Sequence, residues 1–109
     1  MSLGLIANSA RRLANSIGND EVVLKIGVFV RSSRYLDPGW KYLGSDSTSV
    51  SKEMINEATK RLFDRLSYYV RSLSYVEQRA YLIQVCDPYG DNCQFDAVGA
   101  SLNELMEKL

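Results

Sequence analysis

The stretch "RLFDRLSYYVRSLSY", residues 61–75, places leucines, aromatic rings and arginines at a spacing that can be tested for helical period. At about 100° per residue, Leu66 and Leu73 share one face, which is expected to pack in the core. Apolar residues keep this period over residues 55–83, and residues 51–85 contain no proline or glycine. The pattern therefore predicts one long central helix over residues 51–85.

A second stripe on the same predicted helix combines arginine with tyrosine. Guanidinium groups pair with anions and aromatic rings offer stacking area, so this stripe is a candidate interaction surface. The same side chains can equally form a half-exposed helix edge whose stems cover the core. Residues 60–79 hold five basic and two acidic residues, an excess too modest to favour nucleic acid. The stripe consists of Arg61, Arg65, Tyr68, Tyr75 and Arg79.

Shorter elements are expected on both sides of this helix. Helical spacing of apolar residues predicts a first helix over residues 6–17 and an amphipathic helix over residues 102–109. The run "VVLKIGVFV", residues 22–30, is ambiguous, because its valines favour a strand whereas Asn19 or Asp20 could cap a helix. Propensity alone prefers the strand.

The fold expected from these elements is all-α, either globin-like or a small helical bundle, with residues 51–85 as the central helix. The alternative is α+β, in which residues 22–31 and residues 80–86 pair as strands. A length of 109 residues fits a single domain, residues 1–109, with one modest core. Because so short a chain leaves wide apolar helix faces to cover, a homodimer is expected.

Composition excludes several classes of function. Lysine plus arginine equals aspartate plus glutamate, 13 each, so no net field draws the chain to nucleic acid or to an anionic membrane. Histidine is absent, so neither a Ser-His-Asp nor a Cys-His nucleophile can be built. No apolar run reaches the roughly 20 residues that cross a bilayer, and the amino terminus lacks the order of a secretory signal. We predict a cytoplasmic protein that is not an enzyme, with no catalytic residue, cofactor or metal.

Two cysteines, Cys86 and Cys93, flank the turn sequence "DPYGDN". Its proline and glycine would bring the cysteines close together, so a disulfide or a redox pair is geometrically possible. The C-x6-C spacing differs from the C-x-x-C of redox helices, and without histidine the pair cannot complete a familiar zinc site. In a cytoplasmic chain, two reduced and half-buried thiols are favoured.

Residues 64–75, "DRLSYYVRSLSY", resemble a helix of the phycobiliproteins, the globin-like light-harvesting subunits, in which a Tyr-Tyr-Leu-Arg run precedes a Thr-Tyr pair. Tyr68, Arg71 and Tyr75 match that pattern. The bilin-attaching cysteine of the family falls on Leu62, which has no thiol, so the resemblance implies a relative without covalent pigment. It also implies that the protein contacts light-harvesting antenna subunits by packing helix on helix.

For function, these observations predict a non-catalytic, chromophore-free interaction or regulatory protein that resembles phycobilisome subunits and takes part in photosynthesis. Its partner would be another protein, bound through the arginine and tyrosine stripe, and insertion into a membrane is not expected. The alternative is a small nucleic-acid-associated or general regulatory helical dimer, which would use Arg61, Arg65, Tyr68 and Arg79.

Overall fold

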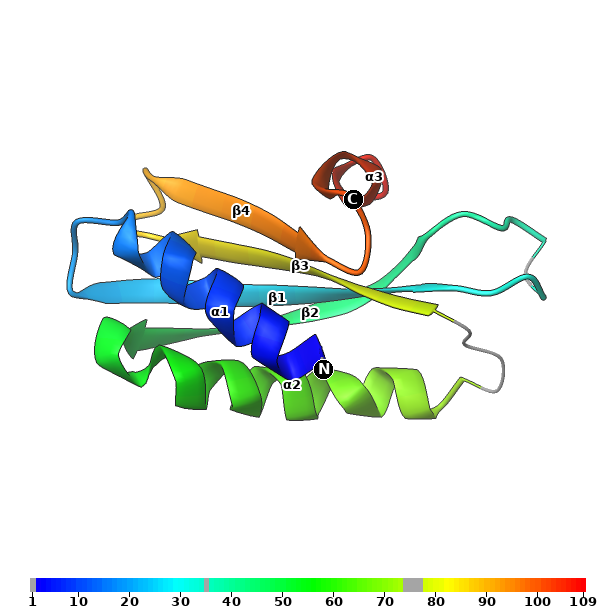
Figure 1. The fold of residues 1–109 in the computed structure, drawn as a ribbon, viewed down its shortest axis with the longest axis horizontal. Coiled ribbons are helices and arrows are strands. Elements are labelled where there is room, and N and C mark those ends of the chain that lie inside the picture. The colour runs from blue at the N-terminus through cyan, green and yellow to red at the C-terminus, as the bar shows by residue number, and fades with distance from the viewer. Residues whose placement is uncertain (1, 35, 74–77) are drawn as a thin grey trace.

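Helices alternate with pairs of strands along the chain, which the computed structural model describes over residues 2–34, 36–73 and 78–109 (Figure 1). A four-stranded sheet forms the middle layer, α1 and α2 cover one of its faces, and α3 lies against the other (Figure 1). In chain order the elements are α1 (Ser2–Asn15), β1 (Glu21–Arg31), β2 (Lys41–Ser51), the 3-10 turn η1 (Lys52–Met54), α2 (Ile55–Arg71), β3 (Gln78–Cys86), β4 (Cys93–Val98) and α3 (Leu102–Met106).

The sheet is antiparallel throughout, with the strand order β2-β1-β3-β4. β1 therefore has hydrogen-bonded neighbours on both sides. A β-bulge interrupts the ladder between β1 and β2 after Val28. Because successive side chains of a strand point to opposite faces, the register defines rows of side chains that cross the whole sheet.

The main core lies between the sheet and the two longer helices. Every second side chain of β1, from Val22 to Val30, is buried there. Phe29, between two of them, is buried on the opposite face, which explains why this strand contains an almost continuous apolar run. Helical spacing buries the apolar faces of α1 and α2 against these residues, through Ile6, Ala10, Leu13, Ile55, Ala58, Leu62, Leu66 and Val70.

A smaller core lies under α3, where Phe29 packs with Trp40 and Leu105. α3 begins with a capping box, in which the Ser101 hydroxyl accepts from the Glu104 amide and the Glu104 carboxylate accepts from the Ser101 amide. The same carboxylate accepts from the Trp40 indole at 3.2 Å. α3 is thus fixed to the connector that precedes β2.

The hairpin between β3 and β4 is closed by a disulfide between Cys86 and Cys93. The reduced thiols favoured from the sequence are therefore not found, because strand pairing places the two cysteines directly opposite each other. The turn between them is built on the Asp87 carboxylate. It accepts three backbone amides at 2.9 to 3.0 Å, those of Tyr89, Asp91 and Asn92.

The all-α prediction is wrong, and the alternative α+β fold is confirmed. α2 ends at Arg71 instead of continuing to residue 85, and residues 78–86 form β3, which pairs with β1. Side chains on both faces of β3 are buried, so its apolar residues fit a helical period as well as a strand. Pairing with β1 decides between the two. The description of the protein as helical, and the globin-like fold implied by the phycobiliprotein resemblance, are wrong for the same reason.

Three glycines provide a graded test of this backbone. Gly99 has a φ of 91°, and a Cβ there would lie 2.6 Å from the Arg79 carbonyl oxygen. Gly90 has a φ of 78° but open space around it, and Gly18 has open space and no positive φ. We expect Gly99→Ala to lower the free energy of unfolding by more than about 2 kcal/mol, Gly90→Ala by about 1 kcal/mol, and Gly18→Ala by less than either.

Urea unfolding followed by circular dichroism measures all three variants, with Gly18→Ala as the matched control. Equal losses for Gly99→Ala and Gly18→Ala would contradict the close approach of the turn after β4 to the backbone of β3.

Candidate protein-docking face

The arginine and tyrosine residues predicted as an interaction surface do not form a single stripe. Arg61, Arg65 and Tyr68 are exposed on α2, but Arg79 lies on β3, beyond the end of that helix. Tyr75 lies outside the described residues. The helical phase that related these five residues ends with α2, so only three of them share one element.

Two of these three residues have partners within the protein. The Arg65 guanidinium pairs with the Asp46 carboxylate of β2 at 2.9 Å. The Arg71 guanidinium lies over the Tyr68 ring, 5.2 Å from its centroid. Arg61 forms no ion pair with any residue that the structure describes. Part of the predicted surface therefore makes contacts within the protein, either between α2 and the sheet or within α2.

Asp46 belongs to a row of four side chains on the helix-covered face of the sheet. By register, Asp46 of β2 lies opposite Ile26 of β1, Ile26 lies opposite Ile83 of β3, and Ile83 lies opposite Asp96 of β4. Both isoleucines are fully buried. The row thus has an apolar centre and one carboxylate at each edge of the sheet.

Each of these carboxylates binds the helix above it. Asp46 binds Arg65 of α2, whereas Asp96 binds Arg12 of α1 and accepts the Ser9 hydroxyl at 2.6 Å. Burial raises the pKa of Asp96, but hydrogen bonds from Ser9 and a backbone amide, together with the Arg12 charge, lower it below its ordinary value. Asp96 is therefore held in its ionised form.

Each carboxylate also binds the backbone amide of the next residue. Asp46 Oδ1 accepts from the Ser47 N–H at 2.9 Å, and Asp96 Oδ1 accepts from the Ala97 N–H at 2.8 Å. In addition, the Thr48 hydroxyl donates to the backbone carbonyl of Ser49 on β2, at 3.3 Å. Backbone groups on both edge strands are thereby occupied by side chains.

The direction of these amides follows from the alternation of backbone bonds in the sheet. The Cα atoms of Cys86 and Cys93 lie 4.0 Å apart, the short spacing of an antiparallel pair that exchanges no backbone bonds. Hydrogen-bonded and non-hydrogen-bonded pairs alternate along each antiparallel ladder. Counting from this pair, Ala97 and Ser47 both fall in non-hydrogen-bonded pairs, so their amides point away from the sheet. Both edges have thus lost an outward donor, which makes them poor templates for a further strand.

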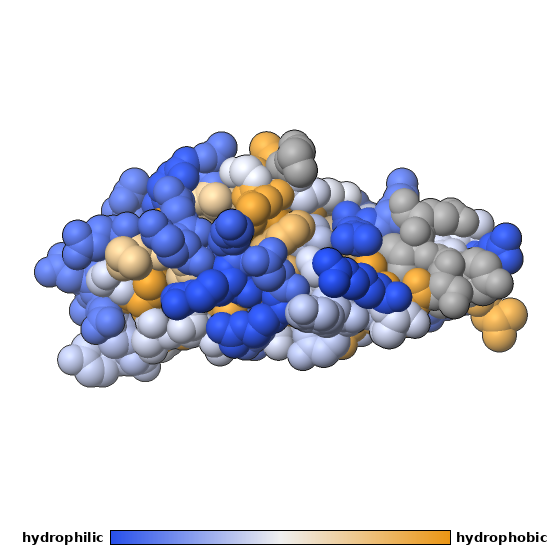
Figure 2. Space-filling model, turned by 90° about the horizontal axis from the view of Figure 1, so that it is seen from below, coloured by the Kyte–Doolittle hydropathy of each residue, from blue (hydrophilic) through white to orange (hydrophobic). Residues whose placement is uncertain are grey.

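A shallow hollow of about 530 Å³ lies between α1 and α2. Its apolar side is formed by Leu3, Gly4 and Ala7 of α1, and the polar residues that complete it are Asn8, Arg11, Asn56 and Lys60. Figure 2 shows apolar side chains among hydrophilic ones on this side of the molecule. The Arg11 guanidinium spans the two helices, because it donates to Asn56 Oδ1 at 2.8 Å and to Asn8 Oδ1.

Sequence reasoning missed the residues of this hollow. Leu3, Ala7 and Arg11 recur every four positions, so they share one side of a helix, and that spacing was the available signal. Nothing in the sequence indicated that Lys60 would lie across from them.

On the opposite face of the sheet, a small hollow of about 40 Å³ lies between Lys25, Gly27, Tyr42 and Gln84. Within the described ranges, no group of three or more cysteine, aspartate or glutamate side chains is placed to hold a metal ion. Among the described helices, none combines the length and apolar character required to cross a membrane.

No protein-family model, curated protein or solved structure matches this chain. The comparisons therefore leave the phycobiliprotein resemblance untested. They give no support to the predicted phycobilisome partner or to the predicted role in photosynthesis.

Replacing Asp96 by asparagine should reduce the amount by which the free energy of unfolding decreases in acid. A carboxylate whose pKa is lowered by folding stabilises the protein above its ordinary pKa of about 4, and this contribution disappears as the pH falls through the folded-state pKa. From about pH 5 to about pH 2, the free energy of unfolding should therefore fall more steeply in the unmodified protein than in Asp96→Asn.

The control is Asp64→Asn, because Asp64 is exposed on α2 and its carboxylate makes no ion pair with a described residue. Urea unfolding at a series of pH values gives each curve. If the free energy of unfolding decreased equally in acid for the two variants, Asp96 would contribute no more to the pH dependence of stability than Asp64 does.

Proposed function

We propose that the protein is a non-catalytic binding module that takes an acidic, amphipathic helix of a protein partner against the hollow between α1 and α2. The observation that carries the proposal is the composition of this hollow, which combines apolar side chains with two cations, Arg11 and Lys60. An apolar stripe on the partner would cover Leu3 and Ala7, and its carboxylates would reach the cations.

The charge on this surface is available to a partner. Arg11 is held by the amide oxygens of Asn8 and Asn56, which are neutral acceptors, so its charge is not balanced by a carboxylate. Lys60 makes no ion pair with a described residue, although Glu57 and Asp64 are its neighbours on α2. Carboxylates on an incoming helix would therefore meet two cations, of which Arg11 is already held in place.

The shape of the surface favours a helix over an extended strand. Two helices that diverge over a sheet leave a groove between them, and a third helix can pack its ridges into such a groove. A strand would instead need a free sheet edge, and both edges carry an aspartate bound to an outward amide. A helix of about 14 residues would match the length of α1.

Other partners have less support. A second copy of the chain, expected from the sequence, would have to place one of its own acidic helices in the hollow. Nucleic acid would use the cations of α2, but Arg65 is paired with Asp46 and Arg79 lies on a different element. The predicted cytoplasmic location remains a prediction, and a disulfide is uncommon in that compartment.

A pair of designed peptides tests this function directly. The probe has leucines at i, i+3, i+4 and i+7 and glutamate elsewhere, whereas the control has the same leucines and lysine elsewhere. We expect only the glutamate peptide to bind, with amide chemical-shift changes at Ala7 and Lys60 in NMR titrations. Added salt should weaken the interaction, because exposed ion pairs are screened.

Lys60→Ala and Arg11→Ala should each weaken this peptide by about twofold to fivefold, the usual range for an exposed ion pair. Arg61→Ala is the matched control, since Arg61 is the next residue on α2 but does not line the hollow. Equal binding of both peptides would contradict the proposal, as would shift changes confined to another face. A third outcome is that the peptide does not bind, the protein self-associates, and Lys60→Ala abolishes the self-association. The occupant of the hollow would then be a second copy of the chain and not a different protein.

A further inference from the structure

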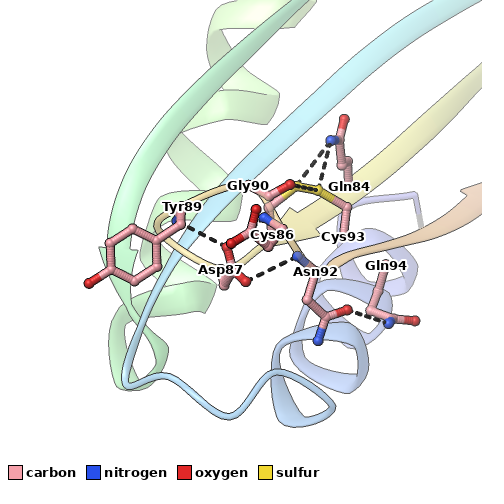
Figure 3. Close-up of a disulfide and its surroundings, with 9 residues drawn as sticks. Gln84, Cys86, Asp87, Tyr89, Gly90, Asn92, Cys93 and Gln94 are labelled. Atoms are coloured by element: carbon pink, nitrogen blue, oxygen red, sulfur yellow. Dashed lines mark hydrogen bonds between the residues drawn. A yellow bond between two sulfur atoms is a disulfide. The ribbon is translucent and has the colours of Figure 1, made fainter.

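The disulfide between Cys86 and Cys93 in the β3–β4 hairpin is a second candidate site, and Figure 3 shows its surroundings. The Cys86 side chain is buried, whereas Cys93 is half-buried. The pair lies on the face of the sheet opposite α1 and α2, and α3 covers only the part of that face around Phe29. A thiol in solution can therefore approach Cys93 more readily than Cys86.

The turn does not need the disulfide to keep its shape. The Asp87 carboxylate holds three amides of the turn, and the Asp87 amide donates to the Asn92 carbonyl at 3.0 Å. The ladder between β3 and β4 continues up to the cysteine pair. The bond closes a short loop between strands that already pair, so loop closure gains little from it. After reduction, the two sulfur atoms would remain opposite each other.

Gln84 supplies a donor to both sulfur atoms. Its Nε2 lies 3.1 Å from Cys86 Sγ and 3.6 Å from Cys93 Sγ (Figure 3). Lys25 is directly opposite Gln84 in the register and belongs to the same face of the sheet. An amide donor and a nearby cation both favour the thiolate form of a cysteine, and a stabilised thiolate is a good leaving group.

We propose that Cys86–Cys93 is a thiol–disulfide exchange site that reacts with dithiols, and that Cys93 is the sulfur attacked. One thiolate of the dithiol forms a mixed disulfide with Cys93 Sγ. The Cys86–Cys93 bond breaks, and its electron pair leaves on Cys86 Sγ, where Gln84 donates to the new thiolate before water protonates it.

The second thiolate of the dithiol then attacks the first sulfur of the same dithiol, which is bonded to Cys93 Sγ in the mixed disulfide. This attack releases Cys93 as a thiolate, which is then protonated. Two electrons and two protons pass to the hairpin, and the dithiol becomes a disulfide. The reverse reaction restores the bond, because the Asp87 turn keeps the two thiols together.

Reduction of the folded protein tests this proposal, with dithiothreitol as the dithiol. Free thiols are alkylated at intervals and counted by mass spectrometry, while circular dichroism follows the fold. We expect both thiols to appear much faster than the chain unfolds, with no change in the dichroism spectrum. Reduction that only keeps pace with global unfolding, measured by hydrogen exchange of core amides, would identify a structural crosslink and overturn the proposal.

Single-cysteine variants test which sulfur reacts. With glutathione disulfide as the probe, the Cys93 thiol in Cys86→Ser should form a mixed disulfide about tenfold faster than the Cys86 thiol in Cys93→Ser, because Cys93 is half-buried whereas Cys86 is buried, and access governs the rate. Equal rates, or a faster Cys86, would overturn the assignment of Cys93.

The contribution of Gln84 is tested by Gln84→Leu, which should slow reduction by dithiothreitol about fivefold, the effect of one lost hydrogen bond. Gln94→Leu is the matched control, since the Gln94 amide binds Asn92 and neither sulfur. Equal rates for these two variants would remove Gln84 from the mechanism.

Discussion

Pairing of β1 along both of its edges is the constraint on which the rest of the structure depends. β1 lies between β2 and β3, and its alternating side chains supply both cores, from Val22 to Val30 under the long helices and with Phe29 under α3. A slip of one residue would exchange these two sets between the faces of the sheet. The register of β1 therefore also decides which residues of the other strands lie in each row.

One of these rows organises the surface. Because Ile26 and Ile83 occupy its centre, the two edge positions fall to Asp46 and Asp96, which lie close enough to both a helix and an outward amide to bind each. The same carboxylates that tie α1 and α2 to the sheet thus discourage further strand pairing. Our two functional proposals concern other surfaces, the hollow between the helices and the sheet face that carries the disulfide.

The helical parts of the fold could be predicted because their apolar residues face one side only. Residues 55–70 follow a single helical period, and α2 buries the expected face. β1 and β3 are buried on both faces, so their apolar runs fit a helical period as well as a strand, and the pattern predicts a helix that continues to residue 85 where residues 78–86 form β3. For that reason Arg79 lies on β3 and does not continue the predicted stripe on α2. Arg11 and Lys60 come from helices far apart in the sequence, and no local pattern could bring them together.

The amino-acid sequence by itself determined the apolar faces of α1 and α2, the balance of charge and the absence of imidazole chemistry, because these properties depend on composition and local spacing. Only the tertiary structure decided that residues 78–86 form a strand, that the cysteines meet, and that Arg65 is paired while Arg11 faces a hollow. Each of these outcomes requires a partner from a distant part of the chain, and the register of the sheet brings that partner into place.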